Sequence, residues 1–100
     1  VLGPGAGAGS FIITGTDNGF TLQITAGAGS SSNAIVATGT FNTPFLVLPH
    51  AVFSPGNSAT AAANNRMFIG SITLNSLTFN ITKPSLVSGT VYLWRFIVLG

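Results

Sequence analysis

The segment with the sequence TVYLWRFIVLG, residues 90–100, constrains the fold most, because it is apolar on both faces of a strand. Successive side chains of a strand point to opposite faces of the sheet. One face would carry Thr90, Tyr92, Trp94, Phe96 and Val98, and the other Val91, Leu93, Arg95, Ile97 and Leu99. Such a strand is typically buried on both sides. We expect it to be covered by its own domain, by a partner chain or by lipid.

The length of the apolar tracts argues against lipid. The longest tracts are residues 44–53, interrupted by Pro49 and His50, and residues 91–99, interrupted by Arg95. A membrane-spanning helix needs about 20 apolar residues. No initiator Met and no charged stretch before an apolar run is present, so we expect a mature or excised domain rather than a precursor.

Charged residues are rare in this sequence of 100 residues. Asp17, Arg66, Lys83 and Arg95 make up 4% of the chain, whereas a typical domain is about 25% charged. The net charge of +2 comes from three scattered cations, which do not form the basic stripe of a nucleic-acid-binding protein. A lone soluble domain normally carries more charge. We therefore expect part of the surface to be covered in an assembly.

Short strand-like segments separated by turn residues predict an all-β fold. The expected strands are residues 11–16, 19–26, 34–41, 45–53, 66–74, 76–82 and 90–100. The Asp-Asn-Gly sequence after the first of these is a hairpin signal. Pro49 cannot donate to a ladder, so its strand should lie at an edge or contain a bulge. Seven or eight strands without a long helix predict one small antiparallel β-sandwich over residues 11–100.

Two segments lie outside the expected strands. Residues 1–10, VLGPGAGAGS, are expected to be a Gly/Ala-rich flexible linker or stalk exit. Residues 54–65, SPGNSATAAANN, are expected to be a long loop in which ATAAA could form one helical turn, too short to be stable alone.

Catalytic and metal-ligating side chains are too few for an enzyme. His50 is the single His, Asp17 is the single acid, and the chain has no Cys. Paired carboxylates, thiolate metal sites and disulfides are therefore impossible. No Ser lies in a nucleophile elbow, and GPGAGAG lacks the strand, the helix and the Lys of a nucleotide-binding loop. We expect no enzymatic activity, no metal and no cofactor, and we expect His50 to be a packed or interface residue.

Four further residues are candidates for structural or oligomeric contacts. If Arg95 points inward, its charge must be paired, because a lone buried charge is very costly. We expect it to contact Asp17 or backbone carbonyls, within the subunit or across a subunit boundary. Asp17 can also cap a turn through its side chain. Tyr92 and Trp94 share a strand face, and packing in a core or interface is favoured over a sugar-binding aromatic row.

The loop of residues 54–65 and the residue after it are candidates for external contacts. Loops on rigid sandwiches often carry recognition. Asn64, Asn65 and Arg66 could hydrogen-bond sugar hydroxyls or an acidic group. The alternative is that this segment only connects two strands.

Several segments between residues 15 and 100 resemble a family of domains. They are GTDNGFTLQITAGAGSSSNAIVATGTFNTPF, SPGNSATAAANN, SITLNSLTFNI and LVSGTVYLWRFIVLG. In this order they resemble the C-terminal domain of bacteriophage and prophage tail-fibre proteins. The resemblance implies a small trimeric β-sandwich at the distal end of a fibre, similar in outline to the carbohydrate-binding H-type lectins. Arg95 departs from the family pattern, where a small polar residue is usual, and no lectin sugar-binding residue is matched.

The expected function is structural and adhesive. The chain would be the head domain of a virion tail fibre or spike, forming a homotrimer that binds a host-surface glycan or protein, without nucleic acid or membrane insertion. In the terminal strand, one face would pack in the sandwich and the other would lie near the three-fold interface.

Two alternatives remain open. One is a subunit of a bacterial or archaeal extracellular filament that polymerises by strand addition, with GPGAGAGSFIITG as the donor. The other is a virion capsid or decoration protein. A fibre head forms a closed ring of copies, whereas a filament forms an open helix.

Overall fold

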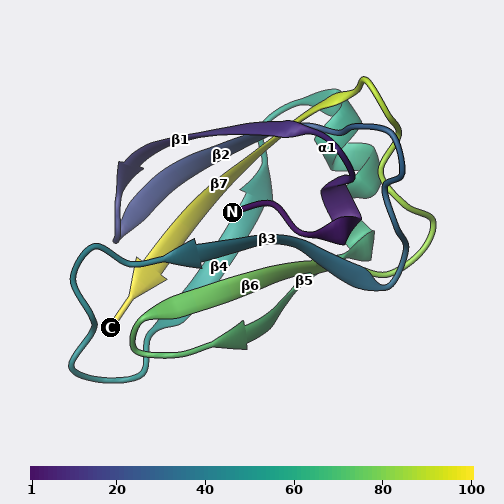
Figure 1. Cartoon of the computed structure of the whole chain (residues 1–100). Coiled ribbons are helices and arrows are strands. Elements are labelled where there is room, and N and C mark those ends of the chain that lie inside the picture. The colour runs from purple at the N-terminus through teal and green to yellow at the C-terminus, as the bar shows by residue number, and fades with distance from the viewer.

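The structure, a computed structural model that describes all of residues 1–100, has two antiparallel sheets (Figure 1). The strands are β1 (Ser10–Thr16), β2 (Gly19–Thr25), β3 (Ala34–Thr40), β4 (His50–Pro55), β5 (Met67–Ile72), β6 (Ser76–Ile81) and β7 (Val91–Leu99). One sheet has the order β1-β2-β7-β4 and the other β3-β6-β5. The three short helices are η1 (Pro4–Ala6), α1 (Ser58–Ala63) and η2 (Asn64–Arg66). The small antiparallel β-sandwich predicted from the sequence is confirmed.

The core lies between the inner faces of the two sheets, and Phe79 of β6 is at its centre. The Phe79 ring makes edge-to-face contacts with Trp94 and Phe96 of β7, with 5.0 Å between ring centroids in each pair. The Phe53 ring of β4 meets the same ring at 4.8 Å. Edge-to-face pairs stabilise a core beyond the apolar area that they bury. The aromatic residues of the last strand therefore hold the two sheets together.

The expectation that the last strand is buried on both faces is half right. Tyr92, Trp94, Phe96 and Val98 point into the core and are fully or almost fully buried. The side chains between them belong to the outer face of the sheet, where Leu93 is half-buried and Val91, Arg95, Ile97 and Leu99 are exposed. The outer face is therefore available for contact with another molecule.

The strand expected over residues 45–53 is wrong in its first half. β4 begins only at His50, and an irregular loop precedes it. The backbone N–H groups of Phe41 and Phe45 donate to Asn75 and Leu74 of the β5–β6 turn at 2.7 and 2.8 Å. The chain crosses here from one sheet to the other, so its backbone bonds to a turn instead of a strand. β4 lies at a sheet edge, as Pro49 predicts.

The Gly/Ala-rich segment at the start of the chain lies against the sandwich. Residues 1–3 run beside β3, where the Gly3 N–H donates to the Val36 carbonyl at 2.9 Å. Leu2 forms a bridge with Ala37, and Ala6 of η1 is completely buried. This arrangement differs from the flexible linker that the composition predicts, because small residues let the backbone approach β3 closely.

The helical turn expected in the ATAAA sequence is present as α1. Asn57 caps it, since the Asn57 side chain accepts a hydrogen bond from the Thr60 backbone N–H at 2.9 Å. A helix this short is not stable alone. It packs on β7 and β4, so tertiary contacts supply the stability that its length does not.

Candidate functional site

The outer face of the four-stranded sheet carries an apolar patch formed by Val52, Ile97 and Leu99. Val52 of β4 lies directly opposite Ile97 of β7, and the three side chains are 64%, 54% and 65% exposed. A shallow hollow of about 490 Å³ adjoins the patch above Gly19, which has no side chain to fill it. We call these three residues the outer patch.

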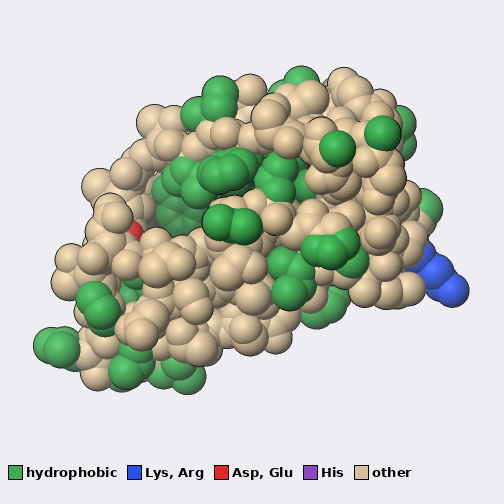
Figure 2. Space-filling model, viewed as in Figure 1, with side chains coloured by type: hydrophobic (Ala, Val, Ile, Leu, Met, Phe, Trp, Pro, Cys, Tyr) green, Lys and Arg blue, Asp and Glu red, His purple; other side chains and the backbone are tan.

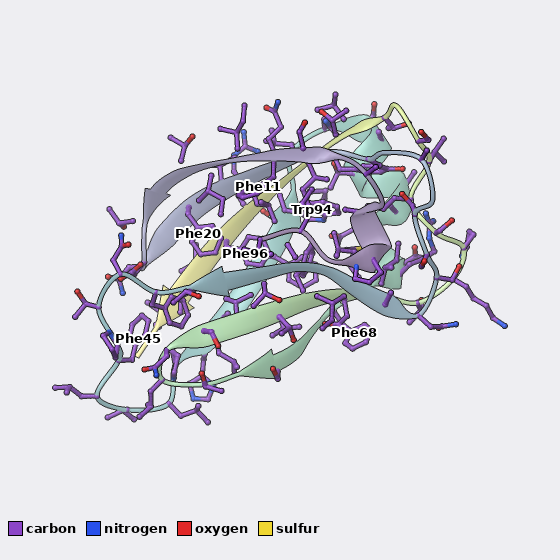
Figure 3. The ribbon with its side chains drawn as sticks, viewed as in Figure 1. Phe11, Phe20, Phe45, Phe68, Trp94 and Phe96 are labelled. Carbon is purple, nitrogen blue, oxygen red and sulfur yellow. The ribbon has the colours of Figure 1, made fainter.

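A second apolar surface lies between the edge strands β1 and β3, where the sandwich is open on one side. Figure 2 shows hydrophobic side chains gathered in a hollow at this place. Phe11 and Phe20 reach into it, as does the edge of the core around Phe96 (Figure 3). Ile13 and Leu22 also line it. We call this surface, lined by Phe11, Ile13, Phe20 and Leu22, the open flank.

The open flank ends in a hollow of about 350 Å³ near the β1–β2 turn. Its walls there include backbone and side chains of Asp17, Thr38, Thr40 and Asn42. The hollow is thus apolar toward the core and polar toward solvent. Polar groups and the aromatic residues Phe20 and Phe41 meet in this hollow.

The structure brings Asn64, Asn65 and Arg66 together in η2, at the end of α1. The Arg66 Nε–H donates to the Pro84 carbonyl at 3.1 Å, and an Arg66 terminal nitrogen donates to the Ala62 carbonyl at 3.3 Å. The guanidinium therefore ties η2 to the segment before β7. Asn65 is exposed, whereas the Asn64 side-chain oxygen is buried without a partner.

The expected contact between Arg95 and Asp17 is not formed. Both Asp17 carboxylate oxygens accept backbone N–H groups at 3.0 Å, one from Asn42 and the other from Thr43. Arg95 lies on the exposed outer face beside the outer patch. Its charge is solvated there, so it needs no buried partner. Asp17 acts as a cap, but for the loop after β3 rather than for its own turn.

Tyr92 and Trp94 lie in the core, not on an exposed sugar-binding face. Their rings stack at 5.7 Å between centroids. The Tyr92 hydroxyl accepts the Val87 N–H at 3.0 Å and so holds the segment before β7. The Trp94 indole N–H is buried without a hydrogen-bond partner.

The structure shows one exposed apolar segment that sequence reasoning missed. Leu46, Val47 and Leu48 are consecutive and exposed, Leu46 almost completely. Their apolar pattern predicts a strand, because exposed apolar runs and buried strands have the same composition. The signal that could have placed them in a loop is their position between two prolines, Pro44 and Pro49. His50, expected as packed or at an interface, is exposed at the start of β4.

Neither metal-ligating clusters nor membrane-spanning helices are found. No group of three His, Cys, Asp or Glu side chains lies close enough to hold a metal ion. None of the helices has the length and apolar character needed to cross a membrane. In comparisons with known proteins, no family model, no curated protein and no solved structure matches this chain.

Proposed function

We propose that the chain is a structural and adhesive module, the head domain of a virion tail fibre or spike. In this proposal it forms a homotrimer and binds a receptor on the host surface, for which a glycan is our first candidate. The observation that carries the proposal is the outer patch of Val52, Ile97 and Leu99. These side chains stay exposed on the outer face although the two sheets of the chain pack against each other on their inner faces.

Self-association through the outer patch is supported by composition as well as geometry. Large exposed apolar patches on soluble proteins usually mark interaction sites. The nearest charge is Arg95, whose long side chain lies at the rim beside Ile97. Only four charged residues are present in the chain, so copies can approach one another with little like-charge repulsion.

A trimeric head would present three copies of each loop in one direction. Weak single sites for a glycan then gain strength by multivalent binding. Asn65 of η2 is the residue we propose for receptor contact, because its amide side chain is exposed at the surface.

The experiment is a molar-mass measurement by light scattering on a size-exclusion column, with negative-stain images of the same sample. We expect discrete particles whose mass is a multiple of three chains. Ile97→Lys places a charge in the outer patch and should abolish the three-fold multiple. Val87→Lys is the matched control, since Val87 is similarly exposed but lies in the segment before β7.

Two results would overturn the proposal. One is a mass with no factor of three, and the other is a set of long polymers, which would make the chain a filament subunit. If the trimer is found, a glycan array probed with it tests the receptor class. Absence of glycan binding with retained cell attachment would point to a protein receptor instead.

A further inference from the structure

β1 is an edge strand that nothing in the chain protects. It pairs only with β2, and all seven of its residues, Ser10 to Thr16, are exposed. An exposed edge presents unpaired N–H and C=O groups to which another strand can add. Natural sheets usually guard such edges with charged residues, prolines, bulges or a covering segment. β1 contains no charge and no proline, and its pairing with β2 is regular throughout.

The other edges of the two sheets carry these protections. The edge of β3 is covered by the start of the chain, where Val1 and Thr38 exchange backbone hydrogen bonds at 2.8 and 2.9 Å. A bulge between Ile69 and Ser71 interrupts β5. β4 ends in Pro55, so its edge is broken at that end. β1 therefore differs from every other edge strand of the molecule.

We propose that β1 pairs antiparallel with β1 of a second copy of this chain. A two-fold axis perpendicular to the sheet then joins two four-stranded sheets into one sheet of eight strands. If all seven residues of β1 pair with the seven residues of the second β1, the middle residue, Ile13, lies opposite Ile13 of the second copy. Ser10 then lies opposite Thr16 of the second copy, and Phe11 lies opposite Gly15, which has no side chain to meet the ring.

The hydrogen bonds available at this edge fit that register. The β1–β2 turn has two residues, so Thr16 and Gly19 form the closing pair of the hairpin. In an antiparallel ladder, hydrogen-bonded and non-hydrogen-bonded pairs alternate. The backbone groups of Phe11, Ile13 and Gly15 therefore point away from β2. In the register centred on Ile13, these outward-pointing N–H and C=O groups lie opposite those of the second copy, Phe11 against Gly15 and Ile13 against Ile13.

The same pairing covers the open flank. Phe11 and Ile13 lie on the inner face, because they pair with Ile24 and Leu22 of the core. Residues directly opposite each other in a sheet share a face. The two three-stranded sheets consequently lie on the same side of the joined sheet, and the two open flanks face each other across the axis. The hydrophobic hollow seen in Figure 2 is thereby shielded from water.

Charge does not oppose this contact. Asp17 follows β1 directly, but antiparallel pairing places the two copies of Asp17 at opposite ends of the joined strands. β1 is itself uncharged and extended, so a second copy can add at this edge without like-charge repulsion. This inference does not depend on the outer patch, since the two surfaces use different residues and different symmetry axes.

Cysteine cross-linking tests the register directly, because the chain has no cysteine of its own. In a hydrogen-bonded antiparallel pair the Cα atoms are about 5.5 Å apart, within the range of a disulfide. Ile13→Cys should therefore give a disulfide-linked dimer with copper-phenanthroline in air. Ser10→Cys alone should not, because its two copies are at opposite ends of the joint strand. A mixture of Ser10→Cys and Thr16→Cys should form a cross-linked heterodimer.

A second test measures mass with the edge blocked. Ile13→Pro removes one N–H that points away from β2, so the β1–β2 ladder is kept while the edge is blocked. We expect it to halve the molar mass, whereas Ile13→Thr, which keeps the N–H, retains the dimer. Circular dichroism confirms that each variant is folded. If Ile13→Cys cross-links no faster than Val87→Cys, the proposed pairing is overturned whatever Ile13→Pro does.

The outcomes separate this inference from the proposed trimer. A molar mass of two chains supports the β1 pairing alone. A molar mass of three chains supports association through the outer patch alone, and a molar mass of six chains supports both contacts. The β1 pairing is overturned if the molar mass corresponds to one or three chains and the Ile13→Cys variant fails to cross-link.

Discussion

The backbone N–H of Leu93 in β7 donates to the side-chain hydroxyl of Thr60 in α1 at 2.6 Å. The same hydroxyl donates to the Asn57 side-chain oxygen, also at 2.6 Å, and Thr60 is completely buried. This chain of hydrogen bonds joins the helix cap to β7, an inner strand of the four-stranded sheet. The segment between β4 and β5 is thus a structural part of the sandwich and not only a surface loop.

Replacing Thr60 with Val should destabilise the fold by about 1–3 kcal/mol, because the part-buried Leu93 N–H loses its acceptor. The midpoint of urea unfolding measures the change. Thr60→Ser keeps the hydroxyl and loses only a methyl group, so it is the matched control. Equal unfolding midpoints for the two variants would show that the hydrogen bonds contribute little.

Removing the Asp17 carboxylate should loosen the loop that follows β3. Its two oxygens hold the N–H groups of Asn42 and Thr43, and no other acceptor for these groups is present. We expect Asp17→Ala to speed hydrogen exchange at both amides, measured by NMR, while exchange in β6 stays unchanged. Asp17→Asn keeps one side-chain oxygen and should give an intermediate rate. Unchanged exchange in Asp17→Ala would rule out the capping role.

Much of the fold could be predicted from the sequence because its signals are local. The Asp-Asn-Gly turn and the alternation of Phe20, Leu22 and Ile24 identify the first hairpin. The structure places these side chains at or near the core, as their alternation predicts. The strand from Ser76 to Ile81 shows the same regular alternation of burial.

The features that could not be predicted depend on contacts between distant residues. The bond between Leu93 and Thr60 joins positions far apart in the chain, and no local pattern marks it. Arg66 looks like a free cation in the sequence, yet the Pro84 carbonyl holds it. The run around Leu46 has the composition of a buried strand, yet it is exposed. The Phe45 N–H just before it bonds to Leu74 in a turn rather than to a neighbouring strand, and no local pattern marks that contact.

Gly27 lies where the start of the chain crosses the sandwich. A Cβ atom at this position would overlap the backbone of Ala8, which cannot move aside as a flexible side chain can. We expect Gly27→Ala to detach the segment before β1, so that limited proteolysis cleaves it early. Gly39→Ala is the control, since a Cβ atom there has open space. Equal resistance of the two variants would show that the segment is not held at Gly27.

The neighbours Asn65 and Arg66 should separate receptor binding from structure. Arg66→Ala removes the hydrogen bonds to the Pro84 and Ala62 carbonyls, so we expect a lower unfolding temperature together with any change in binding. The side chain of Asn65 is exposed, and Asn65→Ala should leave the unfolding temperature unchanged. Differential scanning calorimetry and attachment to receptor-bearing cells measure the two properties on the same samples. If Asn65→Ala attaches as well as the parent, the receptor contact lies elsewhere on the surface.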